Sequence, residues 1–263
     1  MEKSTKEKEY APTSHNFQPR YSGPSPNQMT PEQQSIRQSI LISRPNTGLS
    51  GPFGPWLSIP SIARPSQELG RTVRYGTSLS SRESELVILL TGAKFKSEAE
   101  FDIHVGEARR VGISWDVIQS IPRGRLLSEV DGEVSQKNIL LQEEGAFSLK
   151  KVKESVVPML GKEHDNNSNN DGQHTSKVEE NKEKMVNSSI NSNAKKREVA
   201  IVLFTAELLE KSTVSDETYE STKQALDGQD SILVEITSII GYYAYVAYTL
   251  NVFKIPSNVK PKE

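Results

Sequence analysis

The spacing of apolar residues along the chain predicts helices and no substantial sheet. In most of the sequence apolar residues recur three and four positions apart, as on one face of a helix, and no run of strictly alternating residues is present. After a first helix that starts at Pro31, the expected helices cover 61–76, 80–95, 97–111, 114–121, 197–211, 215–227 and 229–252. The last is apolar on nearly all sides, which is typical of the central helix of a bundle. The fold class is therefore predicted to be all-α.

Capping motifs mark where several of these helices begin. Thr30 precedes a proline at the first helical position, and a glutamine follows three residues after it. Ser80 with Glu83, and Ser97 with Glu100, fit the same capping-box spacing. A capping role would explain Glu100 without any part in chemistry.

Two regions differ in composition from the helical part. Residues 1–29 are rich in Pro, Ser, Asn and Lys, and we expect them to be disordered. Residues 125–196 form an expected insertion that is mostly disordered, because eight asparagines fall between positions 165 and 193. A short helix or hairpin is compatible with the apolar positions of 138–160. The expected single domain then comprises 30–124 together with 197–255.

Composition narrows the classes of function. Only 34% of the residues are hydrophobic and the mean hydropathy is -0.56, which agrees with part of the chain lying outside a core. The 32 basic and 34 acidic residues nearly cancel, whereas nucleic-acid binding normally needs a basic excess. With no cysteine, the chain has no disulfide, thiolate metal site or cysteine nucleophile. We expect no nucleic-acid partner.

The most apolar stretch is 236–250, which has 15 residues. A membrane-spanning helix needs about 20 apolar residues, so a buried core helix is the favoured interpretation. The polar, acid-containing N-terminal sequence has no apolar segment of the kind found in signal peptides. We therefore expect a cytoplasmic protein with no membrane association.

The candidate chemistry centres on His104. Glu100 lies four residues before it, so both side chains fall on one face of a helix, close enough for a carboxylate to hold an imidazole. Phe101 and other apolar residues at helical spacing turn that face inward. Glu85, on the preceding predicted helix, is a third candidate. The alternatives are a satisfied core histidine for His104 and an exposed ion pair with Arg82 for Glu85.

Other cofactor and metal sites lack sequence support. His104 is the only histidine outside the regions expected to be disordered, and no HExxH, GxGxxG, Walker or GxSxG motif occurs. We expect neither a metal nor a cofactor. The loop 44–60 is rich in Gly and Pro but carries Phe53 and Trp56, so it is either a packed connector or the wall of a cleft.

These residues resemble a known family. The runs GPFGPWLSIPSIARPSQELGRTVRYGTSLSSRESELVILL and FKSEAEFDIHVGEARRVGIS are similar to the carboxymuconolactone decarboxylase family, which shares its all-helical fold with alkylhydroperoxidase D. The runs TVSDETYESTKQAL and LVEITSIIGYYAYVAYTLNVF resemble the closing helices of that domain. The resemblance covers 30–124 and 197–255 and implies an alkylhydroperoxidase D-like bundle that forms homo-oligomers.

The peroxidase branch of this family uses a Glu, a CxxC pair and a His. Glu85 and His104 match the first and last of these, but Ser97 and Glu100 stand where the cysteines would be. Serine and glutamate cannot replace the reacting thiols, so thiol peroxidase activity is disfavoured. The decarboxylase branch is closer, because it carries a Glu four residues before the His.

The resemblance implies a cofactor-independent decarboxylase or isomerase that acts on a small carboxylated lactone or related cyclic acid. His104 would be the acid–base group, Glu100 would orient it and Glu85 would tune it. Phe53, Trp56, Ser97 and Phe101 are the expected pocket residues. A catalytically inactive binding or scaffold protein on the same fold is the alternative.

Overall fold

A computed structural model describes residues 12, 14–45, 48–123, 146–167 and 177–258, without the side chains of 15 and 164–191. All regular structure in these ranges is helical, which confirms the all-α prediction. The elements are η1 (Ser14–Asn16), η2 (Pro26–Gln28), α1 (Pro31–Ser43), α2 (Phe53–Trp56), α3 (Pro60–Tyr75), α4 (Ser81–Lys94), α5 (Glu98–Arg110), α6 (Trp115–Ser120), α8 (Leu149–Lys151), the π-helical turn η4 (Val152–Val156), α9 (Val157–Asn167), α10 (Lys177–Lys211), α11 (Asp216–Ala225) and α12 (Asp230–Phe253).

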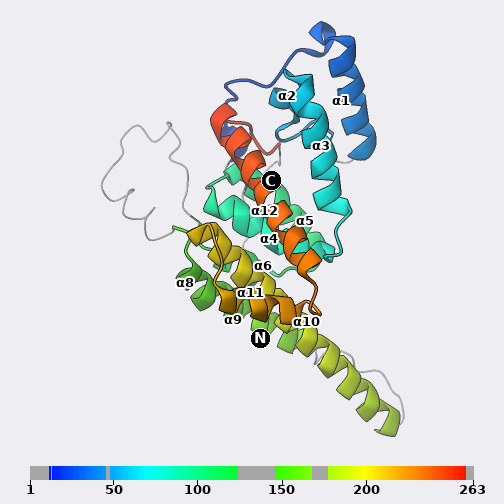
Figure 1. Cartoon of the computed structure of the whole chain (residues 1–263), viewed down its shortest axis with the longest axis vertical. Helices are drawn as coiled ribbons and strands as arrows, with labels where there is room; N and C mark the ends of the chain where they lie inside the picture. Colours follow the sequence, from blue (N-terminus) through cyan, green and yellow to red (C-terminus); the bar gives the residue numbers. More distant parts are fainter. Residues whose placement is uncertain (1–11, 13, 46–47, 124–145, 168–176, 259–263) are drawn as a thin grey trace, which may run out of the picture.

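Helices α4 and α12 form the centre of the bundle (Figure 1). Every residue of 83–93 in α4 is buried, although an isolated surface helix would keep one polar face in water. Helix α12 packs against α3, α4, α5 and α10. The prediction of a central last helix therefore holds, and α4 shares that position with it.

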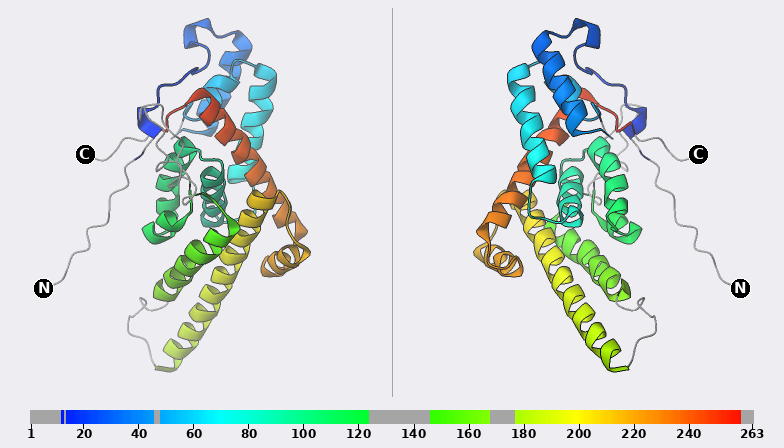
Figure 2. Two further views of the ribbon diagram at one scale, coloured as in Figure 1. Left: turned by 90° about the vertical axis from the view of Figure 1, so that its left-hand side faces the viewer. Right: turned by 90° about the vertical axis from the view of Figure 1, so that its right-hand side faces the viewer.

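The structure differs from the prediction for residues 125–196. Helices α8, η4 and α9 lie in this range, and α10 begins at Lys177. Leu149, Val152, Val156 and Leu160 are buried in the core, because their spacing of three and four residues places them on one face of a continuous helical segment. Figure 2 shows α9 and α10 lying side by side as a long helical pair. Residues 124–145 and 168–176 are outside the described part.

The N-terminal segment also has described structure from residue 14 onward. Ser14 is buried against α5, where its backbone N–H donates to the Asp102 carboxylate at 2.9 Å and its hydroxyl contacts the same oxygen. The expected disorder of 1–29 therefore does not extend over 14–29; residues 1–11 and 13 lie outside the described residues.

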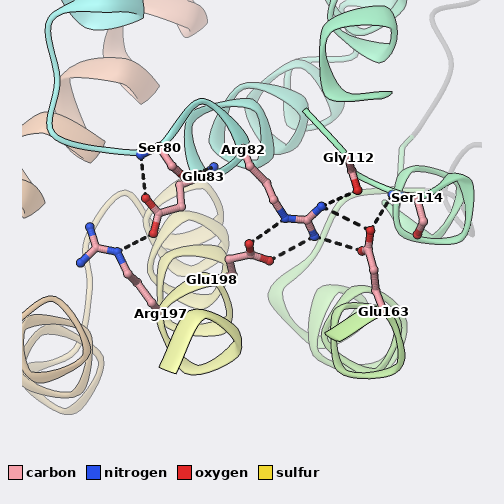
Figure 3. Close-up of polar contacts among 8 residues, drawn as sticks. All are labelled: Ser80, Arg82, Glu83, Gly112, Ser114, Glu163, Arg197 and Glu198. Atoms are coloured by element: carbon pink, nitrogen blue, oxygen red, sulfur yellow. Dashed lines mark hydrogen bonds and ion pairs between the residues drawn. The ribbon is translucent and has the colours of Figure 1, made fainter. Parts of the chain in front are cut away.

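A polar cluster around Arg82 fastens α9 and α10 to the domain (Figure 3). The Arg82 guanidinium contacts Glu198 at 2.7 Å and Glu163 at 3.0 Å, and it donates to the Gly112 carbonyl at 2.6 Å. Glu163 also accepts from the backbone N–H of Ser114 at 2.9 Å. We name these five residues the Arg82 cluster. Since Arg82 has these partners, the alternative of an exposed Arg82–Glu85 pair is wrong.

Helix α12 is long and apolar enough to cross a membrane by length and composition alone, and 56% of its apolar window is buried inside the chain. Four of its apolar residues are exposed, and three of them, Tyr245, Tyr248 and Val252, follow one another at helical spacing along one face. Homo-oligomer formation, which the family resemblance implies, stays a prediction.

Candidate functional site

A cavity of about 80 Å³ opens between α1, α3, α5 and α12 and the loop that leads into α2. Sites for drug-sized ligands are several times larger, so this volume suits a ligand of only a few non-hydrogen atoms. Its wall combines aromatic rings, from Phe53, Tyr242 and Tyr243, with several charged groups. The charged residues of the wall are Arg44, Arg74, Glu100, His104 and Glu107.

His104 is held between two carboxylates. Its Nδ1 lies 2.7 Å from Oε2 of Glu85, and its Nε2 lies 3.0 Å from Oε1 of Glu100. Glu100 and His104 are one turn apart on α5, while Glu85 reaches the ring from α4, the helix packed against α5. Carboxylates accept hydrogen bonds and do not donate when ionised, so this arrangement fits an imidazole that carries a proton on both nitrogens.

The electrostatics favour the same protonation state. Burial alone lowers the pKa of His104, but the charges and hydrogen bonds of Glu85 and Glu100 outweigh it and raise the pKa to about 9. His104 is therefore an imidazolium at neutral pH. A buried imidazolium flanked by carboxylates can give up a proton and regain it, which is the requirement for acid–base chemistry.

Arg74, at the end of α3, connects this group to a third carboxylate and to α12. Its Nη2 lies 3.5 Å from Glu85 and 3.4 Å from Glu107, and its Nη1 donates to the Tyr243 hydroxyl at 3.2 Å. Burial lowers the pKa of Arg74, but Tyr243 and Glu85 raise it further, so the guanidinium stays charged. The Tyr243 ring stands edge-on to His104, with centroids 5.2 Å apart. We name Arg74, Glu85, Glu100, His104 and Tyr243 the His104 cluster.

Glu100 and His104 converge, as their spacing predicts, and the alternative that Glu100 belongs to a capping box is wrong. Ser97 is the N-cap residue of α5, yet its side chain makes no capping hydrogen bond. The Glu100 carboxylate instead contacts His104. By contrast, the capping boxes expected at Thr30 and Ser80 are both formed.

Of the four expected pocket residues, only Phe53 lines the cavity. Trp56 stacks on Tyr245 with ring centroids 4.6 Å apart and donates to Thr249 at 3.1 Å. Ser97 and Phe101 are buried in the core away from the cavity wall. Placing Trp56, Ser97 and Phe101 in the pocket was therefore wrong, because helical spacing gives the inward face but does not distinguish core from cavity.

Sequence reasoning missed Arg44, Arg74, Glu107 and Tyr243. A signal for Arg74 was present: Gln67 and Gly70 are buried on α3, and Arg74 lies one and two turns further along the same face. Tyr243 belongs to a helix whose apolar character concealed its polar hydroxyl. No three His, Cys, Asp or Glu side chains among the described residues are arranged to hold a metal ion.

Comparisons with known proteins add no relative: no protein-family model, no curated protein and no solved structure matches the chain. The resemblance to the carboxymuconolactone decarboxylase family thus depends on the residues quoted for it and stays a prediction.

Proposed function

We propose that the protein is a cofactor-independent lyase, a decarboxylase or isomerase, that acts on a small carboxylated lactone or related cyclic acid. The observation that carries the proposal is the buried His104 imidazolium, held by Glu85 and Glu100 at the wall of a small cavity. Such a group supplies a proton near neutral pH without any bound cofactor.

The contacts support a separate role for each carboxylate. Glu85 does not line the cavity and bonds to Nδ1, so it orients the ring from behind and keeps it basic. Glu100 lines the cavity and lies against Nε2, so it is placed to pass a proton between His104 and a substrate. The resemblance implied that Glu100 orients the ring, whereas the contacts support Glu85 in that role.

In the proposed step the bond between the substrate ring carbon and its carboxylate breaks. Carbon dioxide leaves, and the bonding electron pair stays on the substrate as an enolate. The Arg74 guanidinium, which lines the cavity, stabilises this negative charge. The proton from Nε2 of His104 then reaches the carbon by way of Glu100, and His104 regains a proton from solvent.

The test is the turnover of His104→Gln on a panel of carboxylated lactones and cyclic β-keto acids, followed by release of carbon dioxide. We expect a loss of about 10²- to 10⁴-fold, the usual contribution of a positioned acid–base group. Circular dichroism should show that the variant remains helical. A His104→Gln protein with full activity would contradict the proposal.

Glu85→Gln provides a readout that a purely structural role would not change. The amide keeps the shape of the side chain but removes a charge that raises the pKa of His104. The imidazolium is then lost at lower pH, so the alkaline limb of the rate profile should move to lower pH. Substrate binding with no turnover by the wild-type protein would favour the alternative, a binding protein on the same scaffold.

A further inference from the structure

Arg44 is a buried cation that no acidic residue neutralises in the described part of the chain. It is 6% exposed and caps the C-terminus of α1. Its side-chain hydrogen bonds all go to neutral oxygens: Ser43 Oγ at 3.0 Å, and the carbonyl and side-chain oxygens of Gln67 at 3.0 and 3.4 Å. Its guanidinium also lies over the Phe53 ring, 4.7 Å from the centroid. Buried charges are normally paired, so this one calls for an anion from outside the described chain.

The other arginine of the cavity wall is in a different state. Arg74 contacts Glu85 and Glu107, so carboxylates of the protein itself already offset part of its charge. Burial is the largest influence on Arg44 and lowers its pKa, and no carboxylate acts against this. Arg44 is therefore the cation of the cavity wall that has no carboxylate partner among the described residues.

Tyr242 adds a hydrogen-bond donor to the same wall. It is 6% exposed and lines the cavity, and its hydroxyl has no hydrogen-bond partner among the described residues. The hydroxyl lies against Gly70, where a Cβ atom would fall only 2.1 Å from it. Burial raises the pKa of Tyr242, so the phenol keeps its proton and can donate it to an acceptor.

We infer that Arg44 and Tyr242 form an anion-binding subsite that holds the carboxylate of a small organic acid. The guanidinium matches a carboxylate in two hydrogen bonds, and the phenol supplies a third. Anion binding rests on the geometry alone, and only the assignment of this acid as the substrate rests on the proposed function.

The experiment compares two probes of the same shape, crotonate and crotonamide, by ligand-observed NMR titration of the full chain. The wild-type protein should bind crotonate saturably and crotonamide at least about 10-fold more weakly, since charged hydrogen bonds are the stronger ones. Arg44→Gln should weaken crotonate binding by about 10- to 100-fold. Arg71→Gln, which removes an exposed arginine from α3, is the matched control and should change nothing.

A second variant covers the possibility that Arg44→Gln does not fold. Tyr242→Phe keeps the ring packing and should weaken crotonate binding by about 3- to 10-fold, the share of one neutral donor. Equal binding of the acid and the amide, or unchanged binding in both variants, would overturn the subsite, as would the absence of saturable crotonate binding.

His104→Gln separates this inference from the proposed function. Crotonate binding that survives in His104→Gln but fails in Arg44→Gln supports the subsite whether or not any substrate is turned over. If turnover requires His104 while Arg44→Gln leaves the KM of every substrate unchanged, the subsite is wrong and the proposed function stands.

Discussion

The His104 cluster and the Arg82 cluster are built alike, yet only one of them has the features of a site. Each contains an arginine that contacts two carboxylates from different helices, and the arginine side chains are almost equally buried, at 18% exposed for Arg74 and 19% for Arg82. Burial and charge therefore do not distinguish them. The His104 cluster differs because it borders a cavity and contains a group that titrates within a few pH units of neutrality.

The contacts of the Arg82 cluster are structural. The Arg82 guanidinium donates to two carboxylates and to the backbone carbonyl of Gly112, so these contacts join separate segments of the chain (Figure 3). None of its members lines the cavity of the His104 cluster. A buried ion pair therefore indicates function only when space for a ligand and a titrating group accompany it.

The greatest loss of stability is expected at Arg82. Arg82→Ala removes the cation from the buried Glu198 and the partly buried Glu163, which should lower the free energy of unfolding by about 3 kcal/mol. Urea denaturation measures it. Arg64→Ala, which breaks only the exposed pair with Glu32, should cost no more than about 0.5 kcal/mol. Equal losses in the two variants would show that the Arg82 cluster does not hold the helices together.

The second effect is a pH dependence that belongs to the His104 cluster. The pKa of His104 rises from 6.5 to about 9 on folding, so its contribution is fully present below pH 6.5 and is lost as the pH rises through 9. The size is about 3 kcal/mol, given 1.36 kcal/mol for each pKa unit. Unfolding free energies measured over this pH range should fall in the wild type and fall less in His104→Gln. Parallel curves would contradict the assigned imidazolium.

The smallest effect on stability is expected at the N-cap serines of α4, which carries Arg82, and of α5, which carries His104. Ser80 accepts from the Glu83 backbone N–H at the start of α4, so Ser80→Ala should cost about 1 kcal/mol. The Ser97 hydroxyl is buried without a hydrogen-bond partner, so Ser97→Ala should be neutral or slightly stabilising. Thermal unfolding of the two variants provides the measurement, and a larger loss at Ser97 would reverse the assignment of caps.

Much of the fold was readable from the sequence because it depends on local patterns. The capping boxes at Thr30 and Ser80 and the central position of α12 follow from neighbours within a few residues. The convergence of Glu100 with His104 follows from one helical turn, whereas Glu85 was only a third candidate on the preceding helix, because periodicity does not show which residue it faces. The helices within 146–167 were underestimated, since polar composition obscured a short apolar stripe.

The remaining parts of the site depend on contacts between distant segments. Arg74 meets His104 across 30 residues and Tyr243 across 169, and no periodicity in one helix encodes which other helix will face it. Arg44 shows the same limit, because its place in the cavity is set by Gln67 on a neighbouring helix. Pocket walls are a property of packing between elements, whereas helices are a property of each element alone.

Gly70 has a consequence for how the sequence can vary. A single added carbon at position 70 would collide with the Tyr242 hydroxyl. The two positions should therefore co-vary, because a bulkier residue at position 70 requires a smaller residue at position 242. Chains related to this one should therefore fall into two groups, those with glycine and tyrosine at this pair and those with both replaced. If the Tyr242 hydroxyl donates a hydrogen bond to an anion, only the first group should share this ligand preference.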